Sequence, residues 1–158
     1  MYFSGNNGAA FSSGGADLTG PNRLIRYDTI TDTIAWIADV DPVVSQIKQD
    51  TGYQINGFQD MAEDLSGNVY YLASYGNALV KVSPEGEPSL YYATPNPVQV
   101  NGQIQSGWNG ITAVGNLLVL PDNISGNFYV FDVTKSPTSP TIVPPSNMPS
   151  GYVLNCDK

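Results

Sequence analysis

The 158-residue chain carries 6 basic and 14 acidic residues and no histidine, which gives a net charge of −8. Phosphate backbones repel such a chain, and no Lys/Arg cluster is present to hold an anionic membrane surface, so we expect neither nucleic acid nor membrane as a partner. Without histidine, the chain alone cannot build a Ser/His/Asp or Cys/His nucleophile system, and any metal would have to be a hard cation such as Ca²⁺ held by oxygen ligands.

The first 40 residues predict three strands, at residues 1–4, 23–28 and 34–38. A long Gly/Ser/Asn loop at residues 5–21 separates the first two strands, and it is either a lid or simply a mobile segment. Residues 42–49 break the β pattern, because apolar residues at 43, 44 and 47 with a proline in the first turn predict a short surface helix.

The rest of the chain predicts two units of four strands each, joined by turns rich in Gly, Asn and Pro, which supply the backbone angles of tight hairpins. The predicted strands are residues 57–64, 69–74, 79–82 and 89–93 in one unit, and residues 111–114, 117–120, 128–133 and 141–143 in the other. Residues 69–74 are apolar on both faces, which indicates a sheet packed between two neighbours.

Three segments of the chain resemble one another, at residues 23–28, 78–83 and 128–133. Their starts lie 55 and 50 residues apart, a period typical of four-stranded propeller blades. We therefore predict an all-β fold, a β-propeller of about three four-stranded blades: an incomplete blade at 1–40 and blades at 56–94 and 109–145. This is a partial ring, half of a six-bladed propeller, that opens inside a blade and leaves two apolar faces for a missing propeller half or a second copy.

Two predicted innermost strands begin with the same pair of residues, Asn56-Gly57 and Asn109-Gly110, one blade period apart. Equivalent positions of successive blades point at the same axis, so Asn56 and Asn109 are expected to face each other across the channel mouth. Their carboxamide oxygens could hold Ca²⁺ or bind a polar small-molecule ligand. The alternative is that Asn-Gly is a favoured turn, repeated because the blade is repeated.

Further candidates for the channel mouth flank these pairs. Asp60 is the candidate catalytic carboxylate, as general base or metal ligand, whereas Glu63 and Asp64 are expected to begin a solvated turn. Gln59 is a candidate ligand-binding side chain. Trp108 is a candidate apolar wall for a ligand, with packing between blades as the alternative.

Two residues bear on the cellular compartment. Cys156 is either a free thiol or half of a disulfide whose partner lies outside the chain. The triplet Asn123-Ile124-Ser125 is an N-glycosylation pattern, which predicts a protein that is secreted or in the secretory pathway.

Residues 21–28 and 56–64, followed by Gly67-Asn68-Val69-Tyr70, resemble fungal six-bladed propellers encoded in trichothecene toxin clusters. The resemblance extends from about residue 22 to 132. It implies a protein about twice this length with a leader and further blades on both sides. It also implies a role in fungal secondary metabolism and virulence, with rearrangement or cyclisation of a terpenoid as the chemistry.

The paired Asn-Gly starts are also similar to gluconolactonase- and paraoxonase-type propellers. In that family, Asn and acidic side chains at the channel mouth bind Ca²⁺, which polarises a lactone or ester carbonyl. Asn56 and Asn109 match this pattern, and the acidic partners would lie in the missing blades. Three functions thus remain open: binding or conversion of a terpenoid-like ligand, non-catalytic binding of another protein, and Ca²⁺-dependent hydrolysis.

Overall fold

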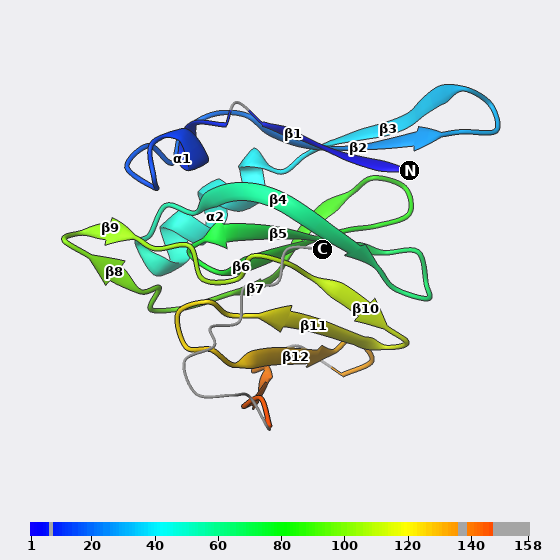
Figure 1. Cartoon of the computed structure of the whole chain (residues 1–158). Helices are drawn as coiled ribbons and strands as arrows, with labels where there is room; N and C mark the ends of the chain where they lie inside the picture. The colour runs from blue at the N-terminus through cyan, green and yellow to red at the C-terminus, as the bar shows by residue number, and fades with distance from the viewer. Residues whose placement is uncertain (7, 136–138, 147–158) are drawn as a thin grey trace.

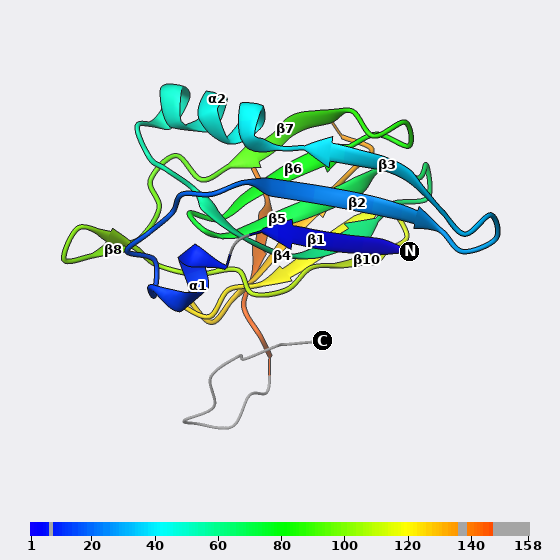
Figure 2. The ribbon, with the colours of Figure 1, turned by 90° about the horizontal axis from the view of Figure 1, so that it is seen from above.

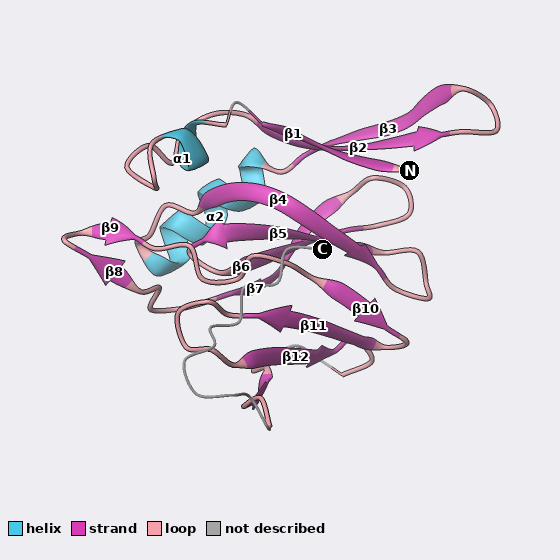
Figure 3. Ribbon diagram, in the orientation of Figure 1, coloured by secondary structure: helices cyan, strands magenta, loops and turns pink. Residues whose placement is uncertain are grey.

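The computed structural model describes residues 1–6, 8–135 and 139–146 and shows an all-β chain (Figure 1, Figure 3). The three larger sheets, which we call the first, second and third sheets, have the strand orders β1-β2-β3, β4-β5-β6-β7 and β10-β11-β12-β13. In each sheet the neighbouring strands are consecutive in the chain and antiparallel. The sheets lie one above the other in chain order (Figure 1). The all-β prediction is confirmed.

The elements have the following bounds. The first sheet contains β1 (Tyr2–Asn6), β2 (Asn22–Asp28) and β3 (Thr33–Asp39), and the second contains β4 (Asn56–Glu63), β5 (Val69–Tyr75), β6 (Ala78–Val82) and β7 (Pro88–Ala93). The third contains β10 (Thr112–Val114), β11 (Leu117–Pro121), β12 (Phe128–Asp132) and β13 (Thr141–Val143). The helices are α1 (Ala9–Ser12) and α2 (Asp41–Thr51), and β8 (Gln99–Val100) pairs with β9 (Gln103–Ile104).

Two apolar clusters hold the sheets together. The first lies between the first and second sheets and includes Leu24 and Val80. The second lies between the second and third sheets and includes Leu79 and Phe131. Strand β5 contributes to both clusters, and all seven of its residues are buried. This explains why residues 69–74 are apolar on both faces.

Helix α2 confirms the helix predicted at residues 42–49. Proline occupies the first turn, and the helix ends at Gly52, whose φ of 80° is in the left-handed region. Its buried side chains, Val43, Val44 and Ile47, join the first apolar cluster. The helix packs against β7, on the side of the molecule away from β1 (Figure 2).

Two elements were not predicted. Helix α1 is a single turn whose N-cap, Gly8, makes no side-chain hydrogen bond, so neither periodicity nor a capping residue marks it within the expected loop at 5–21. The β8–β9 hairpin, in contrast, could have been predicted from its turn residues. Its turn is Asn101-Gly102, with φ of 52° and 79°, and Asn-Gly between short apolar alternations is a strong hairpin pattern.

The chain presents no membrane-crossing helix within its described part, because none of the helices there has both the length and the apolar character required.

Candidate functional site

Four of the predicted site residues lie where the chain passes from the second sheet to the third, and Asn56 lies elsewhere; the four are Gln59, Asp60, Trp108 and Asn109. We call residues 106–109 the junction segment. Ser106 forms a β-bridge with Tyr75, the last residue of β5. The Gly107 amide donates to the Ser74 carbonyl at 3.2 Å, and the Trp108 amide donates to Asn77 Oδ1 at 2.9 Å. The junction segment is therefore tied to the end of β5 at successive residues.

Gly107 has no space for a side chain. A Cβ there would lie 2.5 Å from Asn77 Nδ2 and 2.8 Å from Asp122 Oδ1. The Asn77 Oδ1 atom accepts a hydrogen bond from the Trp108 amide, and Asp122 forms a β-bridge with Trp108. The close approach of these side chains explains the glycine and keeps the second and third sheets in a defined relative position.

Gln59 lies at a β-bulge, where the register between β4 and β5 shifts between Phe58 and Asp60. Such a bulge re-aims a side chain. The Gln59 side chain is exposed, and its Nε2 donates to Ser74 Oγ at 2.7 Å and to the Asn109 carbonyl at 3.1 Å. Within the described residues no hydrogen bond uses its Oε1 atom, so an acceptor remains at the surface.

Asn109 completes a polar pair with Gln59. It is half-buried, and its Oδ1 accepts from Ser106 Oγ at 2.8 Å. Its Nδ2 donates no hydrogen bond to any part of the chain that the structure describes. Gln59 and Asn109 are in contact through the Asn109 carbonyl, and each has a side-chain atom, an acceptor in Gln59 and a donor in Asn109, without a partner among the described residues.

Asp60 connects two sheets. Its Oδ1 accepts from the Met61 amide at 2.9 Å, and its Oδ2 accepts from the Ile111 amide at 2.9 Å. Ile111 directly precedes β10 and is 2% exposed. The carboxylate therefore links β4 to the start of the third sheet, and its role as a general base stays a prediction.

We expect Asp60→Ala to lower the free energy of unfolding by about 1–3 kcal/mol, because the buried Ile111 amide would lose its acceptor. Urea denaturation followed by circular dichroism measures the change. Asp50→Ala on the exposed side of α2 is the control and should change stability by less than about 0.5 kcal/mol. Equal effects at both positions would contradict the structural role of Asp60.

Trp108 is completely buried. Its ring lies among Tyr92, Tyr129 and Phe131, with ring centroids 5.8, 5.2 and 5.8 Å away. Its Nε1 is buried and has no hydrogen-bond partner among the described residues. The expectation of an apolar wall facing a ligand is not what the structure shows for Trp108. The alternative, packing between sheets, describes its surroundings.

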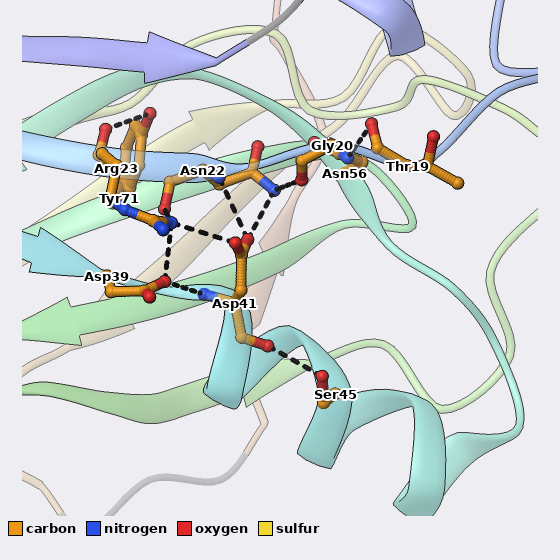
Figure 4. A network of polar contacts seen from close by, with 9 residues as sticks. All are labelled: Thr19, Gly20, Asn22, Arg23, Asp39, Asp41, Ser45, Asn56 and Tyr71. Carbon is orange, nitrogen blue, oxygen red and sulfur yellow. Dashed lines mark hydrogen bonds and ion pairs between the residues drawn. The ribbon is translucent and has the colours of Figure 1, made fainter.

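Asn56 anchors the loop that follows α1. The residue is 4% exposed. Its Nδ2 donates to the carbonyls of Leu18 and Thr19 at 3.0 and 3.3 Å, and its Oδ1 accepts from the Gly57 amide at 2.7 Å. Figure 4 shows Asn56 beside Thr19. The loop at residues 5–21, expected to be either a lid or a mobile segment, is thus bonded at Leu18 and Thr19 to a buried amide of β4.

The two Asn-Gly pairs therefore have different environments. Asn56 bonds to the α1 loop, whereas Asn109 bonds to the junction segment. Gly57 has a φ of 75°, and Gly110 does not have a positive φ. The structure does not show the two carboxamides sharing a partner, because repeated dipeptides occupy unlike backbone conformations in the two sheets.

A second polar network, which the sequence did not predict, lies at the start of α2 (Figure 4). Arg23 Nη1 bonds to Asp41 Oδ2 at 2.9 Å and to Asp39 Oδ1 at 2.7 Å. The hydrogen bond that Arg23 donates to the Asp41 carboxylate raises the pKa of the Arg23 guanidinium. Asp41 Oδ1 also accepts from the amide and side chain of Asn22. Arg23 thus joins two carboxylates from the end of β3 and the start of α2, and the network holds α2 against β2.

The described residues do not fit a Ca²⁺ site by themselves. No group of three or more His, Cys, Asp or Glu side chains in the described ranges could hold a metal, and Ca²⁺ takes 6–8 oxygen ligands. Asn56 Oδ1 and both oxygens of Asp60 already accept amide hydrogens. A calcium ion at Asn56 and Asn109 would need ligands from elsewhere.

Two other predictions concern Asn123, which the structure describes, and Cys156, which it does not. Asn123 lies in the turn between β11 and β12, where its amide donates to the Gly107 carbonyl at 3.0 Å. Its glycosylation, and with it a secretory location, stays a prediction. Cys156 and its pairing lie outside the described residues.

The fold and the site together define an all-β protein of stacked antiparallel sheets with a polar pair at a sheet junction. The chain is 31% identical over 140 residues to the core trichothecene cluster protein 14 of Fusarium sporotrichioides, covering 87% of the chain and 34% of that protein. It is 26% identical over 141 residues to the trichothecene biosynthesis protein 14 of Trichoderma arundinaceum, covering 88% and 36%. The chain therefore spans about a third of the length of the curated relatives it matches, not the half that was expected.

The fold is also similar to a solved structure. The crystal structure of the major Malassezia sympodialis allergen Mala s 1 matches 85% of the chain and 41% of its own chain, with a TM-score of 0.69 and 20% sequence identity. At this identity the likeness concerns the fold alone. No protein-family model matches the chain.

Proposed function

We propose that this chain is part of a fungal β-propeller associated with trichothecene-type secondary metabolism, and that it binds a small oxygenated terpenoid beside Gln59 and Asn109. The observation that carries the association is sequence similarity along 87% of the chain to a protein named for the trichothecene cluster. The proposed position of the ligand rests on the side chains of Gln59 and Asn109, each of which has an unused polar atom among the described residues.

The arrangement of the sheets supports the propeller as a proposal. The first strands of the three sheets, β1, β4 and β10, lie along one side of the stack, and β3 and β7 lie along the other (Figure 2). In a propeller the first side would face the central channel, where ligands bind at the mouth. Gln59 on β4 and Asn109 just before β10 are both on this side of their sheets.

The chemistry of the pair suits a terpenoid that carries few oxygen atoms. Gln59 Oε1 can accept from a ligand hydroxyl, and Asn109 Nδ2 can donate to an ether, epoxide or carbonyl oxygen. Because both carboxamides are neutral, they can bind such groups in a ligand that has no charge. Conversion of the ligand would require a further acid or base, for which Asp60 is the candidate on this chain.

A titration with a trichothecene tests the proposal. We expect the chemical shifts of the side-chain amides of Gln59 and Asn109 to move in the NMR spectrum of the purified chain. Gln59→Leu should weaken binding by about 2- to 10-fold, because one hydrogen bond is lost. Gln46→Leu, an equivalent change at an exposed position of α2, should bind as the unchanged chain does.

Absence of binding, or equal affinity of Gln59→Leu and the unchanged chain, would contradict the proposed site. If added Ca²⁺ were required for binding, the lactonase-like alternative with Asn56 and Asn109 as ligands would be favoured. Binding of a protein in place of a small molecule is the third candidate function. It is favoured by the exposed apolar side chains Phe3 and Ile37, which are 47% and 56% exposed.

A further inference from the structure

We propose that Asn101 of this 158-residue chain is a site of covalent modification, at which the asparagine side chain converts through a cyclic succinimide into aspartate and isoaspartate. The reaction needs no enzyme, and its reagents are water and hydroxide from the solvent. The inference does not depend on the proposed ligand. It rests on the different environments of identical Asn-Gly pairs within one chain.

The reaction takes place between two neighbouring groups of an Asn-Gly pair. Hydroxide removes the proton of the glycine amide, and the amide nitrogen attacks the asparagine Cγ, so that an N–Cγ bond forms. The Cγ–Nδ2 bond then breaks and ammonia leaves with a proton from water. Water adds to one of the two carbonyl carbons of the ring and opens it to aspartate or isoaspartate. The net change is the loss of ammonia and the gain of water, with no oxidation or reduction.

Three structural conditions favour this reaction. Solvent must reach the glycine amide, the asparagine side chain must be free to turn toward that amide, and the backbone must be able to rotate while the ring closes. Glycine helps at the second position because it has no Cβ to obstruct the approach. The sequence has four Asn-Gly pairs, and those that begin at Asn56, Asn101 and Asn109 lie within the described residues.

The pair at Asn101 meets the first two conditions. It forms the turn of the β8–β9 hairpin, which projects from the side of the stacked sheets (Figure 1). Asn101 and Gly102 are both exposed, and a Cβ added at Gly102 would meet no atom within 4 Å. Neither the Asn101 side chain nor the Gly102 amide makes a hydrogen bond with the part of the chain that the structure describes. The attacking nitrogen and the carboxamide are therefore both accessible.

The hairpin also meets the third condition. Strands β8 and β9 form a two-stranded sheet of their own, with Gln99 opposite Ile104 and Val100 opposite Gln103. An isolated two-stranded hairpin is marginally stable in water. Ring closure requires the backbone of Asn101 to leave its φ of 52°, and opening so short a ladder is a local event that leaves the larger sheets intact.

The other two described pairs fail these conditions. Asn56 is 4% exposed, its Nδ2 is bonded to two carbonyls of the α1 loop, and the Gly57 amide donates to its Oδ1 at 2.7 Å. Asn109 is half-buried, its Oδ1 accepts from Ser106 Oγ at 2.8 Å, and Gly110 is buried. Solvent reaches neither glycine amide as it reaches that of Gly102, so the same dipeptide is protected at both positions.

Peptide mass spectrometry of the folded chain, incubated in mildly alkaline buffer, tests the proposal. We expect the peptide with Asn101 to gain the mass difference between water and ammonia, at a rate that rises with pH because hydroxide removes the amide proton. The rate should be at least about tenfold higher than at Asn56 or Asn109, because reaction at a buried pair requires local opening. The product should separate into two peptides, one of which elutes with the peptide of Asn101→Asp.

Two controls show whether the fold sets this order. Asn101→Gln should lose the modification at this position, because the longer side chain would have to close a larger ring. In urea that unfolds the chain, the three pairs should react at similar rates. If Asn101 stays unmodified in the folded chain while it reacts in urea, or if Asn56 reacts as fast as Asn101 in the folded chain, the proposal is wrong. Neither result alters the titration at Gln59.

Discussion

Replacement of Trp108 by alanine is expected to lower the free energy of unfolding by about 3–5 kcal/mol, as is typical for removal of a large aromatic side chain from a core. Trp108 is completely buried and contacts three aromatic rings from both the second and third sheets. The cavity left by alanine would open the contact between these sheets. Urea denaturation, with the midpoint and slope both fitted, measures the change.

Two further variants test whether the lower free energy of unfolding of Trp108→Ala comes from the loss of a buried aromatic ring. Trp36→Ala makes the same change at a half-buried position and should cost less. Trp108→Phe should also cost less than Trp108→Ala, because phenylalanine keeps an aromatic ring in the core and the Trp108 Nε1 has no partner in the part of the chain that the structure describes. If Trp108→Ala left stability unchanged, Trp108 would be accessible to solvent and again a candidate wall for a ligand.

Alkaline pH is expected to destabilise the fold between pH 10 and pH 12. Burial raises the pKa of Tyr71 from its ordinary value of 10 to about 12. Above pH 10 the unfolded chain loses this proton while the folded chain keeps it, so the stability present below pH 10 is lost as the pH rises toward 12. For Tyr71 the loss is about 2–3 kcal/mol.

Other tyrosines act in the same direction. Burial raises the pKa of Tyr70, Tyr91 and Tyr92, so the total loss should exceed that of Tyr71 alone. Urea denaturation at pH values below 10 and approaching 12 measures it. Tyr71→Phe should make the dependence on pH shallower. A free energy of unfolding that stays constant across this range would show that the tyrosines are not buried as described.

Stability and the proposed ligand site are coupled at the junction segment. Gly107, Trp108 and Asn109 are consecutive, yet the first fits between two sheets, the second fills the core, and the third is half-buried in contact with Gln59. A variant of Trp108 would therefore disturb the polar pair as well as the core. Variants of Gln59, which is exposed, are better suited to test ligand binding.

The candidate site was predictable in part. The sequence predicts Asn109 because it begins an innermost strand and Gln59 because it flanks the equivalent Asn-Gly pair, and the structure joins the two through the Asn109 carbonyl. The carboxamide of Asn56 and the ring of Trp108 were chosen by the same logic and are buried. Spacing along the chain places a residue near a sheet edge, but the bulge at Gln59 and the anchored α1 loop decide which side chains reach the surface.

The sequence by itself determined the positions of the strands in the three larger sheets and of helix α2, because alternation, helical spacing and turn residues act over a few neighbouring residues. Only the tertiary structure decided which faces those strands bury. The link from Asp60 to Ile111 and the burial of Trp108 depend on residues distant in the chain. A shift of one residue leaves every local signal unchanged and reverses the face, so no local pattern contains that information.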